Sequence, residues 1–201
     1  MTVICYDTEF LEHGRTIDLI SIGMVSENGD ELYLISNEID LHRLARHEWL
    51  MANVVPYLPL KRIKQEYRDE YELKYFHDDL FWDGDHPDFV RVVDRAMLRR
   101  KVIQFILRCH RPELWAWYGA YDHVALMQLV GTMTGKPDGV PGWTNDLRQI
   151  LHELGDRLSP PDQVSRRHHA LADAQWVMNS LGWVNQAVRQ LASDSIAEFG
   201  P

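Results

Sequence analysis

The first third of the chain alternates short apolar runs with polar turns. The opening apolar run is rich in valine, isoleucine and tyrosine, which favour extended backbone, and it predicts a strand over residues 1–10. Apolar runs over residues 16–25 and 31–36 predict two further strands. The dipeptide Asn28-Gly29 between them is typical of a tight hairpin turn. We therefore expect a β-meander whose second strand is antiparallel to the first.

Helical periodicity dominates the rest of the chain. Apolar residues at three- and four-residue intervals predict helices over residues 41–52, 89–108, 121–130, 146–155 and 170–191. An apolar run at 114–118 predicts a buried strand, and residues 143–147 a short strand or turn. This order suits a mixed sheet with helices on both faces, with the first strand central and the strand at 114–118 beside it. The ends of these two strands then meet at one crevice, the usual place for a site in such sheets.

Residues 60–90 mix charged and aromatic side chains and predict no clear element. Tyr67, Tyr71 and Tyr75 recur every four residues and would line one face of a helix. Packing on the core is the simplest interpretation of this stripe. A surface for self-association or for substrate stacking is the alternative.

The composition is that of a globular protein. The chain has 201 residues, of which 45% are apolar and 25% charged, and this predicts a single domain over residues 1–201 with an extended segment at about 60–90. The sequence contains no run of 18 apolar residues and no basic stretch before its first apolar run, so we expect neither a membrane span nor a signal peptide. Cys5 and Cys109 show no metal or redox spacing, and Cys5 is expected to be a buried, reduced thiol. A cytoplasmic protein is therefore expected.

The net charge of −9 argues against a protein that coats nucleic acid through a basic surface. It is compatible with an enzyme that binds a short strand through metal ions. The acidic metal ligands add to the negative net charge, and bound cations make the electrostatic potential at the site positive.

Two acids follow the first apolar run. Asp7 and Glu9 are two residues apart, so they project to the same side of the predicted strand. Two such carboxylates repel each other unless a cation or a proton lies between them, and Mg²⁺ prefers carboxylate and phosphate oxygens. The alternative is an edge strand with polar residues where the strand ends.

Two further acids lie at predicted helix starts. Asp122 follows the strand at 114–118, where the helix dipole favours a carboxylate for purely structural reasons; it would also face Asp7 and Glu9 across the crevice. The residues alone do not decide between these roles. Asp173 lies among alanines at the start of the last helix, where an acid usually has a partner or faces a cavity.

Two histidines precede Asp173. His169 is four residues before it and would share its helix face, whereas His168 is five residues before it and reaches the same place only from the loop ahead of the helix. Catalytic bases often lie on such loops. By geometry alone both histidines remain candidates.

The ordered set Asp7-Thr-Glu9, Asp122 in a strand–helix turn, and His168 five residues before Asp173 resembles the three motifs of the DEDDh 3′→5′ exonuclease superfamily. That superfamily includes RNase T, oligoribonuclease and the polymerase proofreading subunit. The stretches around these motifs are similar to the small exoribonucleases of actinobacteria. The resemblance implies an α/β fold with a ribonuclease H-like, mixed five-stranded sheet flanked by helices.

The resemblance also implies a mechanism. Two divalent cations, Mg²⁺ or possibly Mn²⁺, would bridge the scissile phosphate. Asp7 would contact both, Glu9 and Asp173 would complete one site, and Asp122 would support the other. The family's histidine position corresponds to His168 as the general base.

Residues next to these motifs are candidates for substrate binding. Glu9 would contact the terminal 3′-hydroxyl, and Phe10, Leu11 and Trp117 are candidates to hold the last nucleotide. Core packing is the simpler interpretation for Trp117.

The implied activity is release of nucleoside 5′-monophosphates from RNA that is single-stranded or has a 3′ overhang. The same chemistry on single-stranded DNA, a phosphodiesterase for free dinucleotides, and a non-catalytic nucleic-acid-binding module are the alternatives. A homodimer is expected from the family, and no membrane partner is expected.

Overall fold

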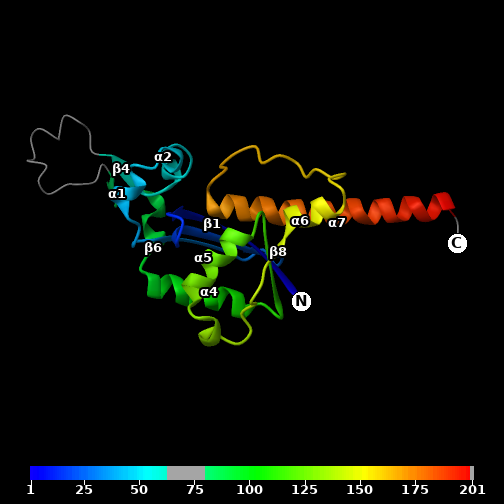
Figure 1. Cartoon of the computed structure of the whole chain (residues 1–201), viewed down its shortest axis with the longest axis horizontal. Helices are drawn as coiled ribbons and strands as arrows, with labels where there is room; N and C mark the ends of the chain where they lie inside the picture. The colour runs from blue at the N-terminus through cyan, green and yellow to red at the C-terminus, as the bar shows by residue number, and fades with distance from the viewer. Residues whose placement is uncertain (63–79, 200–201) are drawn as a thin grey trace, which may run out of the picture.

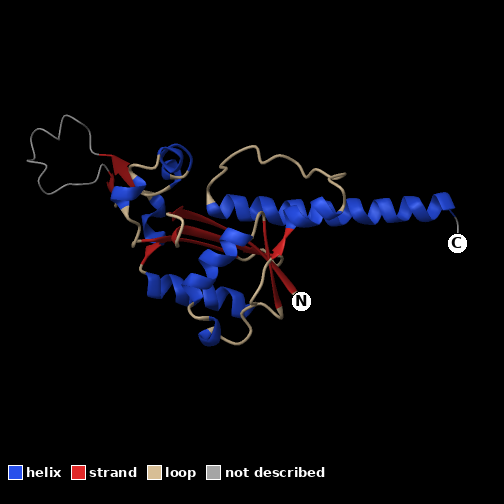
Figure 2. Cartoon of the chain, viewed as in Figure 1, coloured by secondary structure: helices blue, strands red, loops and turns tan. Residues whose placement is uncertain are grey.

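The computed structural model describes residues 1–62 and 80–199 of the 201-residue chain. Its centre is a six-stranded mixed sheet in the order β6-β3-β2-β1-β7-β8, drawn in red in Figure 2. The meander strands pair antiparallel, while β7 lies parallel to β1, β8 to β7, and β6 to β3. The strand bounds are β1 Thr2–Glu12, β2 Ile17–Ser26, β3 Glu31–Ser36, β6 Val92–Val93, β7 Pro112–Ala116 and β8 Asn145–Asp146.

Helices cover both faces of this sheet (Figure 1). Helices α4 and α5 lie on one face, and α7 lies on the other, against β1 and β2. Two short strands, β4 (Leu60–Arg62) and β5 (Leu80–Trp82), form a separate antiparallel ribbon. The helix bounds are α1 Leu41–Leu44, α2 Glu48–Asn53, α4 Arg95–Arg108, α5 Ala120–Val130, α6 Leu147–Glu153 and α7 Ala170–Phe199, with 3₁₀ turns at Val55–Tyr57, Pro87–Arg91 and Met133–Gly135.

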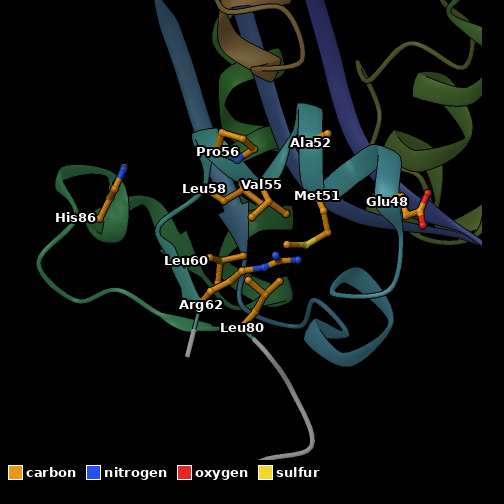
Figure 3. Close-up of a pocket in the computed structure, with 10 residues that line it drawn as sticks. All are labelled: Glu48, Met51, Ala52, Val55, Pro56, Leu58, Leu60, Arg62, Leu80 and His86. Atoms are coloured by element: carbon orange, nitrogen blue, oxygen red, sulfur yellow. The ribbon is translucent and has the colours of Figure 1, made fainter. Parts of the chain in front are cut away.

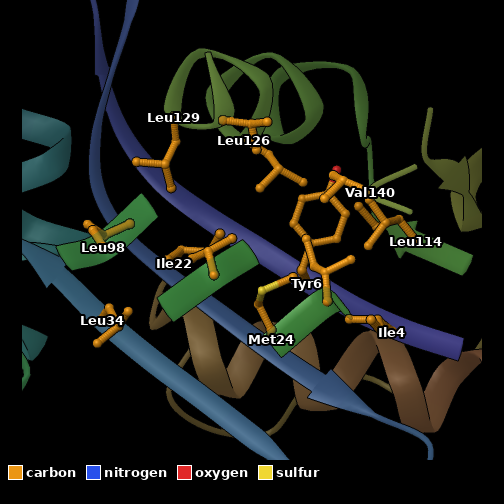
Figure 4. Close-up of a cluster of buried hydrophobic side chains, with 14 residues drawn as sticks. Ile4, Tyr6, Ile22, Met24, Leu34, Leu98, Leu114, Leu126, Leu129 and Val140 are labelled. Carbon is orange, nitrogen blue, oxygen red and sulfur yellow. The ribbon is translucent and has the colours of Figure 1, made fainter. Parts of the chain in front are cut away.

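The alternation of side chains along β1 sorts its residues between the two layers. Ile4 and Tyr6 pack into the core beneath α4 and α5, as Figure 4 shows, where they meet Leu126. Cys5 points to the opposite face and packs with Val177 of α7. Because strand side chains alternate, the acids that follow Cys5 at every second position also face α7.

The sequence predicts this architecture correctly in outline. The predicted α/β fold with a mixed sheet flanked by helices is confirmed, β1 is central with β7 beside it as expected, and the sheet is consistent with a ribonuclease H-like fold. The sheet has a sixth strand, β6, because Val92–Val93 pairs with the end of β3 instead of starting a helix. The cysteines are free thiols and Cys5 is buried, as expected.

Three predicted helix bounds are wrong. The helix expected from residue 89 begins at Arg95, capped by the Asp94 side chain. The helix expected over 41–52 is two short helices, because His47 caps a second helix start. The last helix continues past residue 191 to Phe199. The tyrosine stripe predicted within residues 60–90 lies outside the described residues.

A groove separates α2 from the small β4–β5 ribbon. It has a volume of about 580 Å³ and is lined mainly by apolar side chains, which Figure 3 shows converging from α2, the following turn and the ribbon. The converging residues include Met51, Val55, Leu60 and Leu80. Within residues 1–62 and 80–199, no helix has the length and apolar content needed to cross a membrane.

Gly23 allows the first turn of α7 to lie directly on the sheet. It pairs with Asp7 across β1 and β2. A Cβ added at Gly23 would lie 2.3 Å from the Ala170 carbonyl carbon and 2.3 Å from the Leu171 nitrogen. These are backbone atoms, which cannot turn aside as a flexible side chain can. The position of the α7 start therefore depends on the absence of a side chain here.

We expect Gly23→Ala to destabilise the fold by about 2–3 kcal/mol, because the added methyl group overlaps the α7 backbone. Equilibrium unfolding in urea measures this. Gly182→Ala is the matched control: a Cβ there meets open space within α7, so the change should stabilise by about 0.5–1 kcal/mol through helix propensity. Equal stability of Gly23→Ala and the wild type would contradict the close contact.

Candidate active site

Strand β1 supplies two acids to the face covered by α7. Glu9 is buried and Asp7 is partly exposed. The pairing with β2 shifts between Glu9 and Phe10, so that β2 carries one extra residue, Ile20, at this point. Such a bulge bends the strand locally and often re-aims side chains beside a functional site. Beyond it, the Phe10 ring stacks on Tyr121 of α5, with centroids 5.9 Å apart and planes 8° from parallel.

Asp122 joins α5 to β1. Its Oδ1 accepts hydrogen bonds from the Thr8 backbone N–H at 2.8 Å and the Thr8 hydroxyl at 2.6 Å. The carboxylate is 5% exposed and lies in the first turn of α5. Both roles that the sequence left open are therefore compatible with its placement: it fastens the helix start, and it lies beside the acids of β1.

The turn before α5 is held from another element. Tyr118 has φ +56°, in the left-handed region that non-glycine residues seldom adopt. Asp146 accepts the backbone N–H of Gly119 at 2.9 Å and that of Tyr118 at 3.3 Å, and it also caps α6. This role of Asp146 was not predicted from the sequence. The only signal for it in the sequence is its position at the start of a predicted helix.

Asp173 meets the loop that precedes α7. Its Oδ2 accepts the His168 backbone N–H at 2.9 Å, and its Oδ1 accepts the Gln163 side-chain amide at 2.6 Å. One ligand atom from each of Glu9, His168 and Asp173 lies within 4.8 Å of the other two. The His168 ring also packs edge-on against Trp49, with centroids 4.7 Å apart.

The two neighbouring histidines point to different environments. His168 has φ +65° and lies in the loop, partly buried beside the acids. His169 is 3% exposed and packs against Tyr33, with centroids 4.4 Å apart, on the core side of the helix start. Its Nδ1 accepts the Ala172 backbone N–H. The structure thus brings His168, and not His169, to the carboxylates.

All four acids line one cavity of about 310 Å³. His168 and Thr8 also line it, together with a group of aromatic side chains. That group comprises Phe10, Trp49, Trp117, Tyr118 and Tyr121. A second cavity of about 440 Å³ shares Asp7, Trp117, His168 and Asp173 with the first, and it adds Gln163, Arg167 and Trp176.

The predicted substrate residues divide into two groups. Phe10 and Trp117 line the first cavity, although Trp117 also packs edge-on against Trp176. Leu11 is 3% exposed and lies in the core beside Ala170, so it is not placed to contact a substrate in the cavity. Trp49 was missed because nothing in its own helix marks it. Tyr121 was detectable by its position next to Asp122.

The grouping of the acids raises their affinity for protons. Burial, followed by the nearby acids, raises the pKa of Asp7 well above its usual range. Burial and the neighbouring Asp173 raise the pKa of Glu9 to about 8. Burial raises the pKa of Asp122 to about 6, although the Thr8 hydrogen bonds oppose this, and burial also raises that of Asp173. A buried set of carboxylate oxygens with raised pKa values fits a hard divalent cation, whose charge would replace the protons.

We expect the metal-free protein to lose stability as the pH rises. The pKa of Glu9 is 4.5 in the unfolded chain and about 8 in the folded protein, so the folded state binds this proton more tightly. The stability gained from this proton is fully present below pH 4.5 and is lost as the pH rises toward about 8. In EDTA, the melting temperature should fall between pH 5.5 and pH 8.5 by about 5 °C more in the wild type than in Glu9→Gln. Parallel curves for the two proteins would contradict the shift.

The chain is similar to two proteins from strains of Mycobacterium tuberculosis. It is 39% identical over 170 residues to the 3′-5′ exoribonuclease Rv2179c of strain H37Rv and, equally, to the 3′-5′ exoribonuclease MT2234.1 of strain CDC 1551. Each alignment covers 85% of this chain and 85% of the relative. No protein-family model matches the chain.

Proposed function

Because this chain belongs to the family of these 3′-5′ exoribonucleases, we propose that it is a metal-dependent hydrolase that shortens RNA from its 3′ end. The product is a nucleoside 5′-monophosphate. The observation that carries the proposal is the cavity in which Asp7, Glu9, Asp122 and Asp173 surround a space that His168 also lines. Such a set of groups suits phosphodiester hydrolysis, in which a water must be deprotonated and negative charge stabilised.

The four acids hold two divalent cations in this proposal, with Mg²⁺ as the natural ion and Mn²⁺ as a substitute. Asp7 would hold both, Glu9 and Asp173 would complete one site, and Asp122 would support the other. When bound, the cations supply Lewis-acid stabilisation of the charge that develops on the phosphate. The raised pKa values support this assignment, because they indicate a place where positive charge is favoured.

His168 takes the proton from the attacking water. As the water oxygen bonds to the scissile phosphorus, the bond to the 3′-oxygen of the preceding nucleotide breaks, and that oxygen leaves with the shortened strand. The Asp173 carboxylate accepts the His168 backbone N–H, and the His168 ring makes a T-shaped contact with Trp49. These contacts orient the imidazole toward the acids, and histidine is the side chain that most often accepts a proton in such reactions.

The aromatic side chains of the cavity hold the last nucleotide. Phe10 and Tyr121 already stack on each other, and Tyr121 is 55% exposed, which leaves a ring face for a base. Stacking on aromatic rings is the usual way to hold an unpaired base. Trp49, Trp117 and Tyr118 complete the wall, and Glu9 accepts a hydrogen bond from the terminal 3′-hydroxyl. A single-stranded end or a 3′ overhang satisfies this arrangement.

We further propose that the chain forms a homodimer in the cytoplasm. The C-terminal part of α7 extends beyond the sheet, as Figure 1 shows, and carries Val188 at 38% exposure. An extended helix with apolar residues on its surface suits self-association. Light scattering coupled to size exclusion tests this: a monomer mass at micromolar protein concentration would refute it.

One assay tests the activity. End-labelled RNA and DNA of equal sequence, either single-stranded, blunt-ended or with a 3′ overhang, are incubated with Mg²⁺, Mn²⁺ or EDTA. The expected result is stepwise loss from the RNA 3′ end that requires a metal ion, with nucleoside 5′-monophosphates identified by chromatography. Faster removal of nucleotides from DNA than from RNA would indicate that single-stranded DNA is the substrate. Binding without cleavage under every condition would instead indicate a non-catalytic binding module.

A further inference from the structure

The loop between α6 and α7 is fastened to the candidate site at Gln163. The Gln163 side-chain amide donates to Asp173 Oδ1 at 2.6 Å and to the Ser165 carbonyl oxygen at 3.2 Å. The Gln163 carbonyl oxygen accepts from Arg167 Nε at 3.2 Å. Two residues before Gln163, the Pro161 carbonyl oxygen accepts a hydrogen bond from Trp176 Nε1 of α7 at 2.8 Å. The path of the loop from Pro161 to His168 is therefore set by contacts with α7 and with itself.

We propose that Gln163 is a positioning residue that fixes the Asp173 carboxylate for cation binding and, through the same loop, fixes His168. This proposal rests on the proposed function, since it assigns Asp173 to a cation and His168 to the reacting water. Its basis is the geometry around Asp173, where Gln163 holds one carboxylate oxygen and the His168 backbone N–H holds the other.

The hydrogen-bonding capacity of the groups permits this role. A carboxylate oxygen has two lone pairs, so Oδ1 can accept the amide of Gln163 and still bind a cation. An amide carries no net charge, so it orients the carboxylate without competing with the cation. A lysine or arginine at this position would compete, because its positive charge would take the place of the cation. Hydrogen bonds to metal ligands of this kind commonly change metal affinity by about 10- to 100-fold.

A second glutamine on α7 gives a matched control. Gln175 also donates its side-chain amide to a carboxylate at 2.6 Å, in this case Glu31 Oε1 at the start of β3. Gln175 lines neither the cavity that holds all four acids nor the second cavity, which shares Asp7 and Asp173 with it. Gln163→Met and Gln175→Met therefore each remove one glutamine–carboxylate hydrogen bond and keep the length of the side chain.

The test measures Mn²⁺ affinity without RNA, by calorimetry, on the full chain. We expect Gln163→Met to weaken Mn²⁺ binding at least tenfold, and Gln175→Met to leave it within twofold of the wild type. Gln163→Ala, with its fold checked by circular dichroism, should behave as Gln163→Met does. Unchanged Mn²⁺ affinity in both Gln163 variants would overturn the proposal.

Turnover as a function of metal concentration separates positioning from a general structural effect. In Gln163→Met, the Mg²⁺ concentration for half-maximal RNA cleavage should rise at least tenfold, and saturating Mg²⁺ should recover much of kcat. A lower kcat that no metal concentration improves would overturn the role in cation binding. If the wild type binds Mn²⁺ but cleaves no RNA, the proposed function fails, and the comparison of Mn²⁺ affinities still decides the role of Gln163.

Discussion

Asp7→Asn is expected to lower the rate of RNA shortening about 10³-fold or more while leaving the fold intact. Asp7 lines both cavities next to His168 and Asp173, and in the proposed mechanism it contacts both cations. The amide keeps the shape of the side chain but removes its charge, so it binds cations poorly. Because loss of solvation, followed by the nearby acids, raises the pKa of Asp7, removal of its charge should leave the metal-free protein at least as stable at pH 8.

The measurement combines initial rates at saturating Mg²⁺ with thermal melts in EDTA. Asp18→Asn is the control, because Asp18 is an exposed acid of β2 that pairs with Arg43 and lies outside both cavities. It should keep wild-type activity. If Asp7→Asn kept more than a tenth of wild-type activity, the proposed role of Asp7 as the ligand of both cations would be wrong.

Substitutions of the two adjacent histidines are expected to have different effects, one on kcat and the other on stability. His168→Ala should lower kcat by about 10²- to 10⁴-fold, the usual contribution of a general base, with a melting temperature close to that of the wild type. His169→Ala should keep its chemistry per folded molecule but lose about 1–3 kcal/mol of stability, because a buried ring packed against Tyr33 is removed.

Rates and urea unfolding of the two variants decide between them. The pair is informative because both changes delete the same side chain one residue apart. An inactive His169→Ala protein of normal stability, with an active His168→Ala protein, would reverse the assignment and give the base to the residue that shares a helix face with Asp173.

The acids of β1 were predictable because a strand has a period of two. That regularity alone places Asp7 and Glu9 on one face, and the structure puts that face toward α7. The choice between His168 and His169 was not available from spacing. It depends on a backbone with φ +65° at His168, which lies just ahead of the first residue of α7, and no local pattern announces that conformation.

The residues that sequence reasoning missed are those whose role depends on the path of a loop. Trp49 reaches His168 from a short helix far away in the chain, and Gln163 reaches Asp173 from a stretch without periodicity. The strand Val92–Val93 was missed for a related reason, since its pairing with β3 joins residues more than fifty positions apart. Such contacts are fixed by tertiary packing and leave no local pattern.

The bonds around the four acids divide them into a fixed part and an adjustable part. Asp7 and Glu9 belong to the central strand, and Asp122 is bound to that same strand through Thr8. Asp173 is instead steadied by a loop, through Gln163 and His168. In the proposed mechanism, substitutions in that loop change cation binding and turnover while three of the acids stay in place, so we expect variants of this loop to differ most in metal affinity and kcat.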